Sequence, residues 1–235
     1  MLKKILIGLA ILIGVPLIIA VVFGLRFYNA SKSMTPAETA KVNDSVFALK
    51  DKFVDAYFFK TKTGYFMVDA GMDAKNVEAE MKKLNVDPEK VKAIFLTHTD
   101  GDHIGGVGLF KNAAVYMHKD EEQMVNGQNG KFFFMRIKWA YQKYTLLNDN
   151  DTLSIDGIRI KIIHTPGHTP GSCCFLIGSQ YLATGDNVAY KDKKFEHFID
   201  FFNMDTKLQE ESLKSLKELN TTKYILTGHH GIIIQ

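Results

Sequence analysis

The sequence predicts an α/β domain built from two sheets covered by helices, with one apolar helix in front of it. Three observations support this class. Runs of β-branched and aromatic residues occur in both halves of the chain, with helical patterns between them. The length of 235 residues suits one large core better than two. Residues 5–25 contain no charged side chain, which separates them from the rest.

The apolar segment 5–25 is long enough to cross a bilayer as a helix. Residues 1–4 form a very short tail, which favours an N-terminus inside and a domain outside the cytoplasmic membrane. A cleaved signal peptide is the alternative, but the apolar run exceeds a usual signal core and no small-residue cleavage site precedes Arg26. We therefore expect a retained single-pass anchor, followed by a linker over 26–44.

The domain, expected over 45–235, begins with strand patterns separated by turn residues. A helix with one apolar stripe follows, and Asp87 with Pro88 has the pattern of a helix start. In this half, strands are expected at 45–49, 53–60, 64–68, 93–97 and 113–118, with the helix at 74–84.

The second half contains further strand patterns and a last helix. That helix is expected to start at Thr206, because Thr206 and Gln209 have the spacing of a capping box. Strands are expected at 152–155, 159–163, 173–177, 181–184 and 224–226, and residues 120–149 are less regular.

The segment 131–144 (KFFFMRIKWAYQKY) combines aromatic and basic residues. One interpretation is an amphipathic helix that packs Phe134, Ile137, Tyr141 and Tyr144 on the core. A second is a lid that covers the functional site and selects the substrate. A third is contact with the membrane surface.

Polar side chains that can bind metal follow four of the expected strands. Such strand ends can build a metal site on a rigid sheet without a long loop. The candidate residues are His98, Asp100, Asp102 and His103 after one strand, His168 after another, and Asp186 and His229 after the last two.

These motifs carry a resemblance. HTDGDH at 98–103, GH ending at His168, TGD ending at Asp186 and GHHG at 228–231 resemble the metallo-β-lactamase superfamily, over about four fifths of the chain. The resemblance implies a four-layer αββα sandwich and a pair of metal ions. It assigns His98, Asp100 and His168 to one ion, Asp102, His103 and His229 to the other, Asp186 as the bridge, and Asp69 to orienting a ligand.

Two details of this ligand set remain open. His229 directly follows glycine, as in the family pattern, and His230 is the alternative. Asp100 stands where the family's usual HxHxDH motif has histidine. Zinc is the expected ion, but this added hard carboxylate ligand favours manganese or iron more than usual.

The resemblance implies a hydrolase in which a metal-bridged hydroxide attacks an ester, lactone, thioester, amide or phosphoester, with Asp102 orienting the nucleophile and moving a proton. The alternatives are a phosphodiesterase or nuclease, and a non-catalytic, membrane-tethered metal sensor. Three of the 29 basic residues lie in the first 26 positions. The remaining 26 basic residues equal the 26 acidic residues in number, so the chain after position 26 has no formal net charge. This balance favours a small-molecule substrate over nucleic acid. The sequence predicts no oligomeric state.

Overall fold

The computed structural model describes residues 2–131, 136–137, 139–141 and 143–235. The chain divides into two compact units, 1–34 and 35–235. The first unit contains helix α1 (Leu2–Ser31), and its stretch Leu12–Ser31 has a mean hydropathy of 1.8. Among the described residues, this is the helix that is long and apolar enough to cross a membrane. It is an exposed N-terminal apolar helix, as a signal sequence or a single anchor would be.

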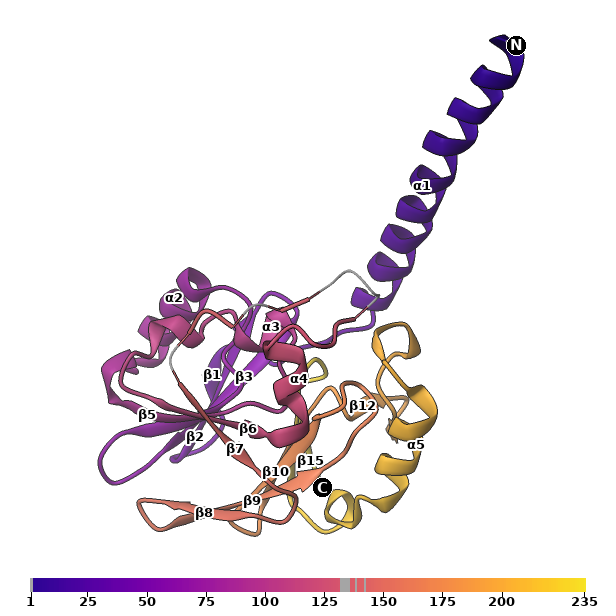
Figure 1. Ribbon diagram of the computed structural model, residues 1–235. Coiled ribbons are helices and arrows are strands. Elements are labelled where there is room, and N and C mark those ends of the chain that lie inside the picture. The colour runs from indigo at the N-terminus through magenta and orange to yellow at the C-terminus, as the bar shows by residue number, and fades with distance from the viewer. Residues whose placement is uncertain (1, 132–135, 138, 142) are drawn as a thin grey trace. The chain divides into compact units, whose positions relative to one another are not determined.

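The second unit contains two mixed sheets (Figure 1). In the first, β1 to β4 are antiparallel neighbours and β4 to β7 are parallel. Its strands, in spatial order, are β1 (Ala40–Lys41), β2 (Val46–Asp51), β3 (Val54–Lys60), β4 (Tyr65–Val68), β5 (Val91–Phe95), β6 (Ala114–His118) and β7 (Tyr144–Leu147).

In the second sheet, β11 and β14 are parallel and the other neighbours are antiparallel. A separate hairpin joins β12 (Ala189–Lys191) to β13 (Lys194–Glu196). The second sheet's strands, in spatial order, are β15 (Ile232–Ile234), β14 (Tyr224–Thr227), β11 (Tyr181–Gly185), β10 (Cys173–Ile177), β9 (Ile158–His164) and β8 (Thr152–Ile155).

Short helices connect these strands. Among the described residues, the α-helices of this unit are α2 (Ala74–Leu84), α3 (Gly101–Ile104), α4 (Glu122–Val125) and α5 (Thr206–Ser215), and the 3-10 helices are η1 (Pro88–Lys90), η2 (Val107–Leu109), η3 (Lys119–Glu121), η4 (Asp200–Phe202) and η5 (Lys217–Asn220).

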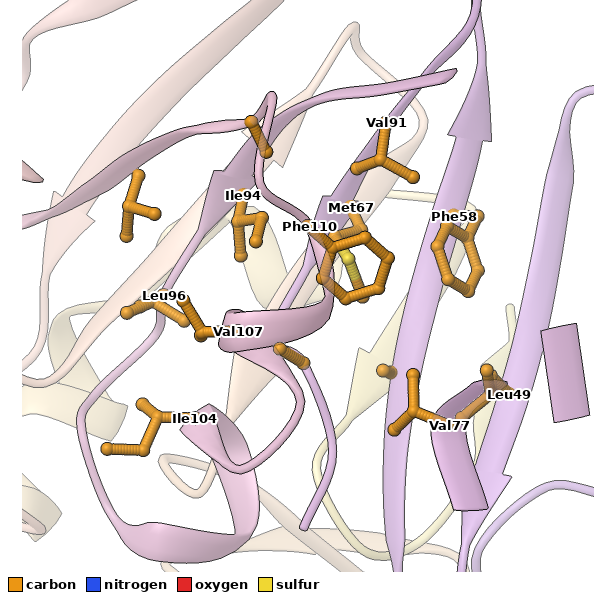
Figure 2. Packing of buried hydrophobic residues seen from close by; sticks show 14 of the residues in the cluster. Leu49, Phe58, Met67, Val77, Val91, Ile94, Leu96, Ile104, Val107 and Phe110 are labelled. Atoms are coloured by element: carbon orange, nitrogen blue, oxygen red, sulfur yellow. The ribbon is translucent and has the colours of Figure 1, made fainter. Parts of the chain in front are cut away.

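Three buried clusters pack against the sheets. The first joins α2 to the first sheet, and Figure 2 shows Val77 of α2 next to Leu49 of β2, while the rings of Phe58 and Phe110 lie 6.4 Å apart. The second cluster contains side chains from both sheets, such as Phe95 and Phe175. The third joins the second sheet to the residues around α5 and η5. The prediction of an α/β fold with two sheets is confirmed.

Several local expectations need correction or completion. α5 begins at Thr206 as expected, but its N-cap is Asp205, whose carboxylate accepts from the Leu208 amide. Asp205 is the stronger cap because it carries a full negative charge at the helix N-terminus. The sequence does not predict the strands β1, β7 and β15 or the hairpin β12–β13.

Within 131–144, the described residues contain no helix, so the predicted amphipathic helix is wrong there. Ile137, Tyr141 and Tyr144 nevertheless pack against the first core cluster, as expected. Phe134 lies outside the described residues. Ile137, Tyr141 and Tyr144 therefore pack against the core although the described part of this segment is not helical.

Candidate metal centre

The ends of four strands deliver the candidate ligands to one place. His98 follows β5, and Asp100 caps α3, which carries Asp102 and His103. His168 lies in the loop between β9 and β10. Asp186 follows β11 directly, and His229 lies in the turn between β14 and β15.

Each of the four histidines is oriented through its Nδ1 atom. Because the partner atoms accept hydrogen bonds, Nδ1 carries the proton and Nε2 presents a lone pair. His98 donates to Thr97 Oγ1 (3.1 Å), His103 to Asp69 Oδ2 (2.9 Å), His168 to Asn203 Oδ1 (3.0 Å) and His229 to the Phe53 carbonyl (2.6 Å).

The Nε2 atoms converge on the aspartates with the spacing of metal ligands. His103 Nε2 lies 3.3 Å and His229 Nε2 3.2 Å from Asp186 Oδ1. Asp102 Oδ2 lies 3.5 Å from His229 Nε2. Ligands held tetrahedrally at about 2.1 Å from an ion are about 3.4 Å apart, so these separations match.

Buried atoms at the centre lack partners. Among the described residues, His98 Nε2, His103 Nε2 and Asp186 Oδ1 are buried and accept no hydrogen bond. Leaving such atoms unpaired is costly, and a cation would satisfy all three. The residues present therefore fit a metal ion.

Three overlapping groups of possible ligands lie here, each with its ligand atoms within 4.8 Å of one another. His230, the alternative to His229, is in none of them. The groups are His98–Asp100–His168, His98–His103–Asp186 and Asp102–His103–His229. All seven candidate ligands from the sequence are thus brought together.

The electrostatics of the centre favour a bound cation. Burial would raise the pKa of Asp186, but His229, His103 and His168 hold it well below its usual value. Burial would lower the pKa of His103, but Asp186, Asp69 and Asp102 raise it well above its usual value. The carboxylates therefore impose a negative potential on the imidazoles.

Asp69 links His103 to Thr97, the residue that orients His98. Its carboxylate accepts from His103 and from the amide and hydroxyl of Thr97, whose oxygen in turn accepts from His98. The orientation of a metal ligand by Asp69 stays a prediction. Gly228 is also required, since a Cβ there would lie 2.4 Å from Asp186 Oδ1.

Residues after Asp186 support the centre without being candidate ligands. Asn203 orients His168 and donates to Gln209 Oε1 (2.6 Å), and Gln209 donates to the Asp186 carbonyl (2.8 Å). Phe198 packs against the rings of His168 and His229. The aromatic content of 195–204 favours a pocket wall, and the spacing of Thr206 and Gln209 favours a helix start, but neither pattern indicates these particular contacts.

Glu121 also supports the centre, although no sequence pattern indicates it. It is fully buried, and its Oε1 accepts from the amide (2.8 Å) and hydroxyl (2.7 Å) of Thr99. Its Oε2 accepts from the hydroxyl of Thr169 (2.6 Å) and the amide of Gly171 (3.0 Å). One carboxylate thereby joins the loop of His98 and Asp100 to the loop of His168.

Glu121→Gln is expected to lower the free energy of unfolding by about 3 kcal/mol, or the Tm by roughly 6–12 °C. The amide nitrogen cannot accept a hydrogen bond, so two buried donors lose their partner. Circular dichroism during heating of the detergent-purified chain would measure this. Glu38→Gln is the control, because Glu38 is 83% exposed and its loss should change little. Equal Tm values for both variants would refute the role of Glu121.

A separate histidine pair lies at the ends of β6 and β9. The rings of His118 and His164 are stacked 3.8 Å apart, and Asp120 lies beside them. These three residues form another possible ligand group. Because an ion binds in the plane of an imidazole ring, the two parallel rings do not suit one shared ion.

The surroundings of His118 predict that the free energy of unfolding decreases at acidic pH. Burial and the neighbouring His164 lower its pKa from 6.5 to about 4. The stability that depends on a neutral His118 is therefore complete above pH 6.5 and is lost as the pH falls from 6.5 to 4, with about 2 kcal/mol gone at pH 5. Urea unfolding at pH 7.5 and pH 5 would measure this difference.

The matched variant is His118→Asn, which keeps an acceptor for the Asp120 amide. The variant should be less stable at both pH values because of its cavity, but it should lose less stability on acidification. An identical pH dependence in both proteins would show that His118 is not responsible.

Comparisons with known proteins agree with this geometry. The model of the metallo-beta-lactamase superfamily matches residues 49–229. A probable metallo-hydrolase of Methanocaldococcus jannaschii is 32% identical over 155 residues, 65% of this chain and 64% of that protein, so this chain spans less than two thirds of its length. An N-acyl homoserine lactonase of a Bacillus species is 26% identical over 81% of this chain and 82% of the lactonase.

Solved structures show the same fold. The Rm3 metallo-β-lactamase aligns with a TM-score of 0.66 at 17% identity, covering 85% of this chain and 81% of that one. A subclass B3 enzyme described as the first with an active-site glutamic acid aligns with a TM-score of 0.66 at 18% identity, covering 86% and 82%. Identities this low support a shared fold and nothing finer.

Proposed function

The chain belongs to the metallo-β-lactamase superfamily as a metallohydrolase, and we propose that it hydrolyses lactones or closely related small esters at the described centre. The observation that carries this proposal is the convergence of four histidine Nε2 atoms on three aspartates, with two of those nitrogens buried and unpaired. Such an arrangement has little use in a purely structural site.

Metal would be held at two neighbouring positions, which are formed by His98, Asp100 and His168 and by Asp102, His103 and His229, with Asp186 between them. Zinc is the proposed ion, because imidazole and carboxylate at this spacing suit it. When bound, the metal lowers the pKa of water and polarises the carbonyl of the substrate.

Asp102 is the proposed general base. Its side chain is 21% exposed, whereas that of Asp186 is 4% exposed, so Asp102 is the more accessible of the two to a substrate. Its Oδ2 lies 3.5 Å from His229 Nε2, which places the carboxylate at the edge of the ligand cluster. From there Asp102 would accept a proton from the attacking water and pass it to the leaving alkoxide.

The proposed substrate class rests on two observations. The lactonase similarity extends over most of both chains. The side chain of Phe198 provides an apolar wall against His168 and His229, which suits the hydrocarbon part of a neutral ester.

The proposed activity can be tested with the zinc-loaded full chain in detergent. The substrates are an N-acyl homoserine lactone, a simple γ-lactone, nitrocefin, a thioester and bis-nitrophenyl phosphate. We expect kcat/KM for a lactone to exceed the values for nitrocefin and the phosphodiester at least 100-fold. Faster hydrolysis of the phosphodiester would instead favour the phosphodiesterase alternative, and loading with zinc without any turnover would favour a sensor.

We also propose that the chain is a single-pass membrane protein with its catalytic domain outside the cytoplasm. The proposed division is a tail at 1–4, an anchor at 5–25, a linker at 26–44 and the hydrolase domain at 45–235. Apolar side chains of α1 such as Leu17 and Ile18 are more than 60% exposed, as a lipid-facing helix requires. Membrane fractionation with intact-mass measurement separates a retained anchor from a cleaved signal.

A further inference from the structure

Lys131 reaches into the centre from the segment that follows α4. Its ammonium group donates to Asp100 Oδ2 and to His168 Nε2, the latter at 2.8 Å. The side chain of Lys131 is 8% exposed. A buried ammonium group is tolerated only with such partners, so this contact is a specific part of the fold.

Lys131 uses the same atoms that a metal would need. The lone pair of His168 Nε2 can accept a hydrogen bond from Lys131 or bind an ion, and it cannot do both at once. His168 Nδ1 is already engaged by Asn203 Oδ1, so the ring has no second nitrogen to offer. Occupation by the ammonium group and occupation by an ion therefore exclude each other at this position.

We propose that the ammonium group of Lys131 takes the His98–Asp100–His168 position, so that the hydrolase holds one metal ion, at Asp102, His103, His229 and Asp186. This inference rests on the proposed metal-dependent function. The ammonium group would take the place of the second metal ion that the sequence pattern predicts.

The carboxylate at position 100 fits this proposal. A histidine there would present a neutral ring to the ammonium group, whereas Asp100 presents a charge-assisted acceptor. His168 Nε2 lies 3.1 Å and His98 Nε2 lies 3.6 Å from Asp100 Oδ2, and Lys131 is the donor that this carboxylate binds. Asp100, in place of the usual histidine, thus provides the charge that the buried ammonium group of Lys131 needs.

At the other position, no described lysine contacts the ligand atoms. His103 Nε2 there is buried and has no hydrogen-bond partner among the described residues, and the same is true of His98 Nε2 at the first position. His229 Nε2 contacts Asp186 and lies 3.5 Å from Asp102, so its lone pair faces carboxylates. An ion there displaces no ammonium group, and it neutralises both aspartates.

Metal stoichiometry tests the proposal independently of activity. The full chain, purified in detergent, is stripped with a chelator, reloaded with zinc and desalted before elemental analysis. Competition with a chromophoric chelator then gives the affinity of each site. Lys131→Met removes the charge at similar length, Lys131→Arg keeps it, and Asp100→His combined with Lys131→Met restores the common ligand pattern.

We expect one zinc ion per wild-type chain, with any second ion bound at least 100-fold more weakly. Lys131→Met should strengthen the second site at least 10-fold, the double variant should retain two ions, and Lys131→Arg should retain one. Two ions of similar affinity in the wild type would overturn the proposal even if a variant fails to fold. Retention of no zinc would contradict the metal centre itself and hence the proposed function.

Discussion

Replacement of Asp102 by asparagine is expected to lower kcat/KM for the preferred substrate by about 10³-fold. Asparagine keeps the shape of the side chain but cannot accept the proton that the proposed mechanism passes through Asp102. The Tm should fall by only a few degrees, because this side chain is partly exposed. Steady-state kinetics and thermal unfolding would measure the two effects, and most of the loss should appear in kcat.

The control for this variant is Asp44→Asn. Asp44 is 99% exposed and pairs with Lys41 on the surface, so its loss should leave both kinetics and stability unchanged. Elemental analysis of the Asp102 variant must accompany the kinetics, since a variant that still holds zinc isolates the proton-transfer role. Activity within threefold of the wild type in a zinc-loaded variant would eliminate Asp102 as the base.

Removal of the metal is expected to abolish hydrolysis and to lower the Tm by roughly 10 °C. An ion present at 1,000 times its Kd adds about 4 kcal/mol to the free energy of unfolding. Without it, Asp102 and Asp186 repel each other, and the buried Nε2 atom of His103 lacks a partner. Chelation followed by scanning calorimetry and an activity assay would measure both losses, and added zinc should restore them.

His229→Gln is the matched variant for the chelation experiment. It removes one imidazole from the centre, so its Tm should already be low and should respond little to the chelator. If chelation left the wild type active and equally stable, with its metal shown to be absent, the centre would have to work by another chemistry.

The candidate ligands could be predicted because they lie within a few residues of recognisable strands. A strand such as β5 has a clear apolar pattern, and the loop after it carries four candidate ligands in the six positions 98–103. Parallel strands such as β11 and β14 end at the same edge of a sheet, which brings Asp186 and His229 together.

Lys131 and Glu121 could not be predicted in this way. Lys131 lies at the start of the segment 131–144, outside the apolar positions of its pattern, and a lysine between glycine and phenylalanine is most often solvent-exposed. Glu121 lies in the 3-10 helix η3, where charged residues are common, so its type does not indicate that it is buried. Their roles depend on partners far along the chain, such as Asp100 for Lys131 and Thr169 for Glu121, and no local pattern encodes those contacts.

The strands that were missed also depend on tertiary contacts. β7 consists of Tyr144–Leu147 and pairs with β6 at the edge of the first sheet. The basic and aromatic residues just before it favoured a helical interpretation. Packing against the core, rather than intrinsic preference, decides the structure of such a segment.

Anomalous diffraction at the zinc absorption edge, from crystals of protein that hydrolyses a lactone, tests the central claim most directly. The account predicts a peak about 2.1 Å from Nε2 of both His103 and His229. Active crystals without an anomalous peak among these residues, under conditions that saturate the protein with zinc, would contradict it.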